Sequence, residues 1–141
     1  MKAPWHLWVV GIATLLWNAM GAVDYTMTQM QNEAYLAGFT DAQRVYFQSF
    51  PAWVVASWAI AVWFALAGSL LLLLRLGAAV LVFAISAIAM IVTTFQNFVL
   101  AEVSMAEIGG PEALWFSVVI FVVAIASWLY ARRMRQAGFL R

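Results

Sequence analysis

The sequence predicts an all-α integral membrane protein: a four-helix bundle with an extramembrane helical hairpin between the first and second helices. The first observation is composition, since 67 % of the 141 residues are apolar and 9 % are charged. Soluble domains average roughly 45–50 % apolar and about 25 % charged residues. A chain this short has too little interior to hide so much apolar surface from water. The other two observations are four long apolar segments and a separation of charge between their ends.

Each apolar segment is long enough to cross a bilayer, which takes about 20 residues for roughly 30 Å of hydrocarbon. The predicted spans cover residues 4–23, 51–74, 76–101 and 113–131. The first span follows Lys2 and resembles a secretion signal, but its apolar run exceeds the roughly 7–15 residues typical of one. We therefore expect it to be a retained helix, and residues 1–141 to form a single transmembrane domain.

Charged side chains separate between the two ends of these spans. Basic residues flank one end, at Lys2, Arg75, Arg132, Arg133, Arg135 and Arg141. All six carboxylates fall at the other end, where Arg44 is the one basic residue: Asp24, Glu33, Asp41, Glu102, Glu107 and Glu112. An excess of Lys and Arg marks the cytoplasmic side of a membrane protein. We therefore predict that both termini are cytoplasmic and that residues 24–50 and 102–112 lie outside.

Residues 24–50 carry helix signals between the first two spans. We expect the first helix to continue to about Ala37, with Gly38 as its stop. Thr40 followed three residues later by Gln43 matches a capping box and predicts a second helix that runs into the second span, with a kink or break where Pro51 lies inside it. The segment is rich in aromatic residues, which we expect to pack between the two arms, against residues 102–112 or against a partner: Tyr25, Tyr35, Phe39, Tyr46, Phe47 and Phe50.

Small and polar residues form stripes at helical spacing on three of the spans. The third span has Ser86, Met90, Thr93 and Asn97 on one face, the first has Gly11, Thr14, Asn18 and Gly21, and the second has Ser57, Ala61, Ala65 and Ser69. Small residues let membrane helices approach closely, and hydroxyl and amide groups bond across their contacts. One interpretation is that the stripes are packing faces.

A second interpretation is a binding site, because the most polar side chains gather near the outer ends of the spans. Polar groups at membrane depth are costly enough to indicate a role. Amides and hydroxyls between flat aromatic walls suit an uncharged polar solute such as a sugar, or a cation attracted by a carboxylate. The candidate solute-binding residues are Asn18, Asp24, Trp53, Trp58, Thr93, Gln96 and Asn97.

The sequence predicts no enzyme chemistry, no metal site and no cofactor. It has no cysteine, and its one histidine, His6, is at the opposite end of the spans from every carboxylate. These facts exclude thiolate sites and a Ser-His-Asp set. The glycine-rich phosphate loops of nucleotide-binding proteins are also missing. The basic run at 132–135 is too short for nucleic acid and fits a topology anchor beside anionic lipid headgroups.

Three stretches carry a family resemblance: "WNAMGAVDYTMTQMQNEAYLAGFT", "FPAWVVASWAIAVW" and "LAGSLLLLLR". Here the chain resembles a family of small, poorly characterised bacterial inner-membrane proteins with four spans. Some members carry an automatic sugar-transporter label. The resemblance implies the bacterial inner membrane as the location and transport as the activity.

We therefore expect a membrane protein that transports or binds a small polar solute. Its partners are the lipid bilayer, the solute and either further copies in a homo-oligomer or a larger membrane complex. The competing interpretation is a non-catalytic accessory or scaffolding subunit that holds a partner protein through the hairpin.

Overall fold

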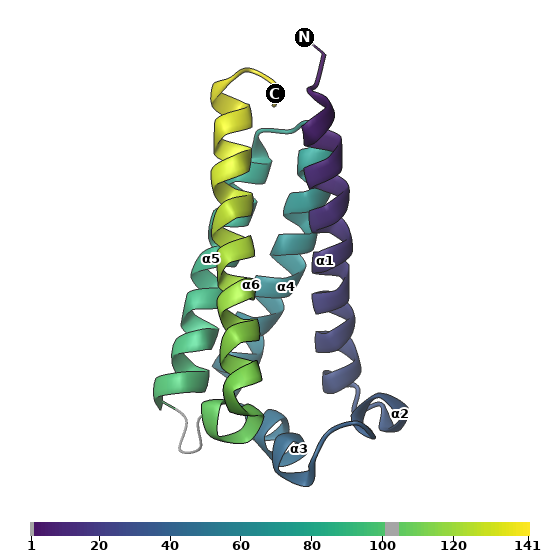
Figure 1. Cartoon of the computed structure of the whole chain (residues 1–141), viewed down its shortest axis with the longest axis vertical. Coiled ribbons are helices and arrows are strands. Elements are labelled where there is room, and N and C mark those ends of the chain that lie inside the picture. The colour runs from purple at the N-terminus through teal and green to yellow at the C-terminus, as the bar shows by residue number, and fades with distance from the viewer. Residues whose placement is uncertain (1, 101–104) are drawn as a thin grey trace.

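Four long helices lie side by side in the computed structural model, which describes residues 2–100 and 105–141 (Figure 1). They are α1 (Trp5–Gln29), α4 (Ala52–Leu73), α5 (Ala78–Phe95), which a π-helical turn η1 (Gln96–Leu100) extends, and α6 (Met105–Gln136). Each is long and apolar enough to cross a membrane. The predicted all-helical class and the four long apolar helices are therefore confirmed. The expected end of the third span at residue 101 and the carboxylate of Glu102 lie outside the described residues.

Successive long helices run in opposite directions, so both chain ends lie at one end of the molecule (Figure 1). We call this the terminal end. The short helices α2 (Glu33–Leu36) and α3 (Asp41–Gln48) lie at the opposite end, which we call the hairpin end. Helix α4 packs against both α1 and α5, and α5 packs against α6.

Glycines allow the closest helix contacts. A Cβ added at Gly11 would lie 2.5 Å from Leu73 Cδ2, and one at Gly68 would lie 2.7 Å from two ring carbons of Phe83. Both distances are shorter than van der Waals contact, so side chains from the neighbouring helices occupy the space that a methyl group would need. The apolar core at the terminal end is built around such contacts, from Leu7, Leu72, Ala79, Phe83, Ala131 and Leu140.

The last residues fold back over the turn between α4 and α5. Gly138 has a φ of 88°, which reverses the chain after α6. The Arg141 N–H then donates to the Arg75 carbonyl (2.8 Å), and the Gly77 N–H donates to the Arg141 carbonyl (2.6 Å). A Cβ at Gly77 would lie 2.8 Å from that oxygen, so glycine is needed for the contact.

The hairpin differs from the prediction in its first arm. The expectation that the first helix continues to Ala37 is wrong, because α1 ends at Gln29 and the short α2 follows. Gln31 adopts a φ of 53°, in the left-handed region, and so ends the helical path. The Asn32 side chain then accepts a hydrogen bond from the Tyr35 N–H and caps α2. Asparagine is one of the best residues for this capping role.

The second arm agrees with the prediction. The Thr40 hydroxyl accepts from the Gln43 N–H (3.1 Å), and Gln43 Oε1 accepts from the Thr40 N–H (3.0 Å), which completes the capping box. Helix α3 ends at Gln48, and Pro51 is the N-cap residue of α4. The expectation of one helix that runs into the span is therefore wrong, and of the expected kink or break at Pro51 the structure has the break, which separates α3 from α4.

Large apolar side chains remain exposed on all four long helices, among them Leu16, Leu70, Leu81 and Val122. Monomeric soluble proteins rarely expose contiguous apolar surface on this scale. The four helices are therefore compatible with a multi-pass membrane protein, in which lipid covers these faces.

Candidate functional site

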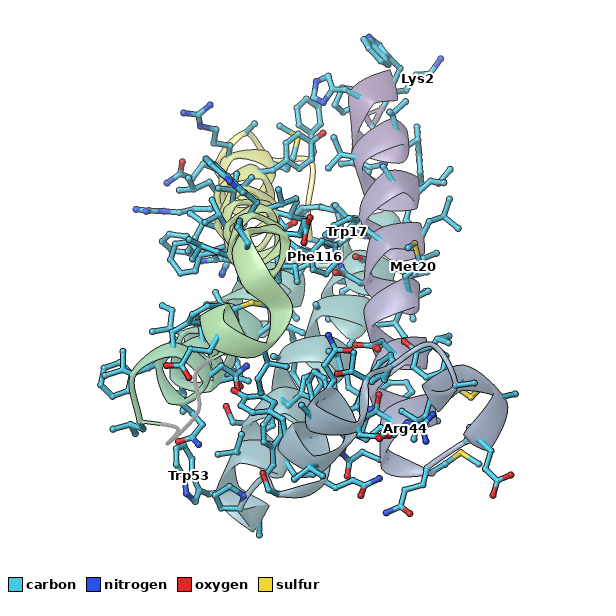
Figure 2. All side chains as sticks on the ribbon, turned by 60° about the horizontal axis from the view of Figure 1, so that its bottom comes forward. Lys2, Trp17, Met20, Arg44, Trp53 and Phe116 are labelled. Carbon is cyan, nitrogen blue, oxygen red and sulfur yellow. The ribbon has the colours of Figure 1, made fainter. Side chains whose placement is uncertain are left out.

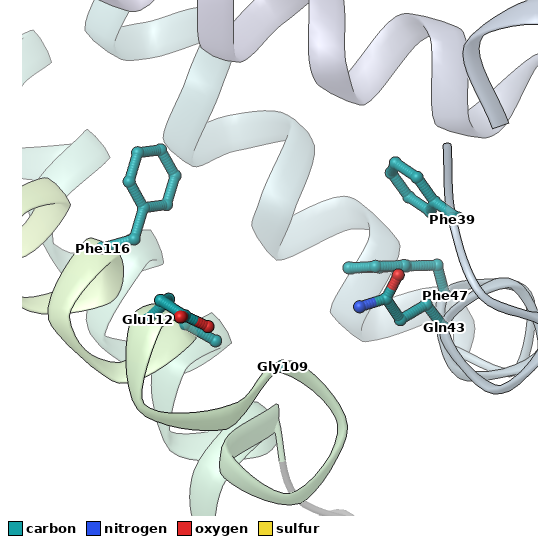
Figure 3. Close-up of a pocket in the computed structure, with 7 residues that line it drawn as sticks. Phe39, Gln43, Phe47, Gly109, Glu112 and Phe116 are labelled. Carbon is teal, nitrogen blue, oxygen red and sulfur yellow. The ribbon is translucent and has the colours of Figure 1, made fainter. Parts of the chain in front are cut away.

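An open groove of about 460 Å³ lies at the hairpin end, between α3 and the start of the apolar part of α6 (Figure 3). Three phenylalanine rings, an amide and a carboxylate line it, together with two small residues: Phe39, Gln43, Phe47, Gly109, Glu112, Ala113 and Phe116. Ligand pockets typically combine apolar walls with a few convergent polar groups. The groove has both.

Local backbone geometry positions the polar groups of the groove. On one side the capping box holds Gln43, whose Oε1 accepts from Thr40, so the amide N–H groups remain for another acceptor. On the other side Gly110 adopts φ 70° and ψ −165°, a conformation that favours glycine, and Pro111 starts the helix that continues to Gln136. The chain therefore turns at Gly110, which places Glu112 in the first turn of the helix that follows.

A layer of aromatic rings supports the groove. The Phe39 and Phe47 ring centroids are 5.8 Å apart, and Phe47 contacts Phe50 at 5.7 Å and Trp58 at 6.1 Å. Trp58 also meets Tyr25 edge to face at 5.0 Å. Such ring pairs add roughly 0.5–1.5 kcal/mol each beyond the area they bury. The aromatic residues predicted to pack between the arms therefore form one layer that joins the hairpin to α1 and α4.

The sequence-predicted residue Asn18 lies in the contact between α1 and α4. Its Nδ2 donates to the Ala65 carbonyl (3.1 Å) and to Ser69 Oγ (2.9 Å). Ser69 Oγ lies 3.1 Å from Thr14 Oγ1, and the Thr14 hydroxyl donates to the Val10 carbonyl. Two of the predicted stripes therefore face each other and are linked by this network.

The predicted residue Thr93 lies in the contact between α4 and α5. Its hydroxyl is 2.7 Å from Ser57 Oγ, and each of the two hydroxyls is 2.9 Å from the Ala89 carbonyl. The Ser86 hydroxyl donates to the Ala61 carbonyl across the same contact (2.6 Å). These hydroxyls join the two helices rather than line the groove.

The remaining predicted residues lie at the hairpin end. Asn97 is in the π-helical turn η1, where its carbonyl and its Oδ1 both accept from the Tyr46 hydroxyl at 3.2 and 3.1 Å. Asp24 Oδ1 accepts from the Tyr35 hydroxyl. Gln96 is half-buried in η1, and Trp53 is 49 % exposed at the start of α4 (Figure 2). None of the seven predicted residues lines the groove, but Trp58 contacts the ring of Phe47, which does.

The two hydrogen-bonded tyrosines of the hairpin have raised pKa values. Burial, together with the hydrogen bond and charge of Asp24, raises the pKa of Tyr35 to about 12. Burial raises the pKa of Tyr46 to about 12. Both phenols therefore stay protonated and act as hydrogen-bond donors throughout the physiological range.

Sequence reasoning did not select the groove residues as a site. The capping box identified Gln43, and the charge pattern placed Glu112 at the outer end of the spans, but neither residue was assigned to a site. Gln43 and Glu112 come together only when the chain folds, because more than sixty residues separate them in the sequence.

Comparisons with protein-family models, with curated proteins and with solved structures find no match for this chain. Within residues 2–100 and 105–141, no group of three His, Cys, Asp or Glu side chains is placed so that it could hold a metal ion.

Proposed function

We propose that the chain is a multi-pass protein of the bacterial inner membrane that binds a small polar solute, such as a sugar, in the groove at its outer face. The positive-inside rule supports this orientation, because the terminal end carries the basic residues and the hairpin end the carboxylates. With this orientation, the groove opens to the exterior. The family resemblance of the sequence also favours a sugar.

The observation that carries the proposal is the combination of aromatic and polar groups in the groove. Phe39, Phe47 and Phe116 offer flat apolar surfaces, which suit the C–H faces of a sugar ring. The Glu112 carboxylate accepts hydrogen bonds from hydroxyl groups, and the Gln43 amide N–H groups donate to them. A solute with an apolar face and a hydroxylated edge fits both sets of partners.

Transport is the wider role that we propose for this binding. A single bundle of four helices is narrow, so a translocation path needs further copies in a homo-oligomer or a larger membrane complex. The solute would then bind at the outer groove before it crosses the membrane between subunits.

The test is a binding measurement on the purified protein in lipid nanodiscs, with a panel of monosaccharides and, for comparison, tetramethylammonium. Hydrogen bonds to a charged group contribute about 1.5–3 kcal/mol, so Glu112→Gln should weaken sugar affinity about tenfold or more. Glu33→Gln is the matched control, since Glu33 is an exposed carboxylate of the same hairpin end outside the groove. The proposal fails if no sugar binds, if Glu112→Gln leaves its affinity unchanged, or if tetramethylammonium alone binds.

One observation favours a second candidate function, that of an accessory subunit. Helix α6 is the least buried of the four long helices, and Trp115 near its start is 70 % exposed. A partner helix could pack on this face. Native purification separates the two candidates, because a larger partner in fixed stoichiometry favours the accessory role and a homo-oligomer favours the transporter.

A further inference from the structure

A second cavity, distinct from the groove, lies in the centre of the bundle among all four long helices. Its volume is about 30 Å³, which is room for one or two water molecules. Polar groups from three helices line it: Asn18 of α1, Ser86 of α5 and Ser127 of α6. The three residues retain 9 %, 2 % and 5 % exposure. A buried polar cavity of this size differs from an apolar packing defect, which stays dry.

The hydrogen bonds of Asn18 fix the orientation of its amide. The Ala65 carbonyl can only accept, so the Asn18 atom 3.1 Å from it must be the NH₂ nitrogen. The second N–H points to Ser69 Oγ. The Asn18 Oδ1 accepts no hydrogen bond from any residue in the described part of the chain. Asn18 lines the cavity and is nine-tenths buried as a residue, so its amide oxygen is left for a ligand.

The two serines also present acceptors to the cavity. The Ser86 hydroxyl donates its proton to the Ala61 carbonyl (2.6 Å), and the Ser127 hydroxyl donates to the Val123 carbonyl (2.7 Å). Each oxygen keeps lone pairs after its proton is committed. The Asn18 amide oxygen and the oxygens of the two serines are therefore all acceptors for a hydrogen-bond donor.

We propose that this cavity is a binding site for a single water molecule, which donates to Asn18 Oδ1 and to a serine oxygen. A neutral donor suits the site because no carboxylate lines it, and a charge at this depth in a membrane is costly. The water joins α1 to the helix of the serine that accepts its second proton, which is α5 or α6.

An aromatic contact lies between the cavity and the groove. The Trp17 ring lines the cavity, the Phe116 ring lines the groove, and the two ring centroids are 6.0 Å apart (Figure 2). The water is therefore separated from the groove, and we expect it to be shielded from reagents in the surrounding solution.

Radiolytic labelling tests the proposal in the full-length protein in nanodiscs. X-rays generate hydroxyl radicals from every water molecule, including buried ones, whereas peroxide chemistry generates them in bulk water only. Met90 lines the cavity and Met30 is 70 % exposed in the hairpin, so their sulfoxides report the two environments. We expect Met90 to be oxidised by X-rays and spared by peroxide, while Met30 is oxidised by both.

Two substitutions test whether the X-ray oxidation of Met90 depends on the cavity. Ala124 lines the cavity and Ala126 is exposed on the same helix, so Ala124→Leu fills the site and Ala126→Leu is the matched control. X-ray oxidation of Met90 should be lost in the first variant and kept in the second. Should Ala124→Leu fail to fold, Ser127→Ala is used, because it removes a cavity acceptor whose own bond stays within α6. No Met90 oxidation by X-rays in the unmodified protein, equal oxidation by peroxide, or oxidation that persists in the filled variant would each overturn the proposal.

Discussion

Replacing Asn18 by alanine removes the two hydrogen bonds that the amide donates from α1 to α4. Hydrogen bonds between membrane helices contribute on average about 0.6 kcal/mol and at most about 1.7 kcal/mol each. The Ala65 carbonyl does not become unsatisfied, because Ala65 lies inside α4, where its carbonyl also accepts the backbone hydrogen bond of the helix. We therefore expect Asn18→Ala to lower the free energy of unfolding by roughly 1–3 kcal/mol. Sugar affinity at the groove should stay unchanged.

The assay is reversible unfolding by a denaturing detergent in mixed micelles, followed by tryptophan fluorescence, together with solute binding in nanodiscs. Met20→Ala is the control on the same helix, since Met20 is 66 % exposed and faces away from α4. The opposite pattern, in which stability is kept and solute binding is lost, would refute the packing role. It would instead place Asn18 in contact with solute, as the binding-site interpretation of the sequence predicts.

Three further predictions test the fold and the hairpin. Gly68→Ala should destabilise the protein by roughly 1–3 kcal/mol, because the new Cβ would lie 2.7 Å from the Phe83 ring. Gly38→Ala is the control and should not, because nothing lies within 4 Å of its Cβ position. Equal unfolding curves for the two variants would contradict the close approach of Phe83 to Gly68. Thr40→Ala should destabilise α3 by about 1 kcal/mol and speed amide exchange in Asp41–Gln48, whereas Thr40→Ser should restore protection. Burial raises the pKa of Tyr46 from the ordinary 10 to about 12, so the contribution of its phenol to the free energy of unfolding should be fully present below pH 10 and lost as the pH rises to about 12. The Tyr46→Phe variant should therefore lose less stability over this interval. If both proteins show the same alkaline transition, the phenol of Tyr46 is not its cause.

The long helices could be predicted because their causes are local. Twenty or more apolar residues in sequence need no partner to be recognised, and Pro51 breaks a helix through its own ring and missing N–H. The capping box at Thr40 and Gln43 is likewise a signal within four residues. These features lie where the sequence indicates them.

The end of α1 was harder to predict because its signal is weak. Met30, Gln31 and Asn32 contain neither glycine nor proline, the usual markers of a helix end. Of these three residues only Asn32 is a typical helix N-cap. Its role as the cap of α2 depends on the turn at Gln31, whose φ is 53°. The hydrogen bond between Tyr35 and Asp24 then holds the short α2 against α1, a tertiary contact that the sequence does not reveal.

The candidate site could be predicted only in part, for a different reason. Helical spacing assigns polar residues to a face, but not to the neighbour that the face will meet. Thr93 faces Ser57, and Asn18 faces Ser69, so side chains chosen for a solute are used between helices. The groove instead combines residues around Gln43 and Glu112, each of which looks structural when read alone.

The contacts of the four long helices differ in kind, and this difference bears on function. Helices α1, α4 and α5 are joined by cross-helix hydrogen bonds and by small residues that bring their backbones close. Helix α6 meets α1 through side-chain tips, in the ring contact of Trp17 with Phe116 and in the hydrogen bond between His6 and Tyr130. A contact between side-chain tips can be remade at lower cost than a close backbone approach, because rotamers change without a shift of the helix axes. Solute binding beside Phe116 would therefore act first on the contact between α1 and α6.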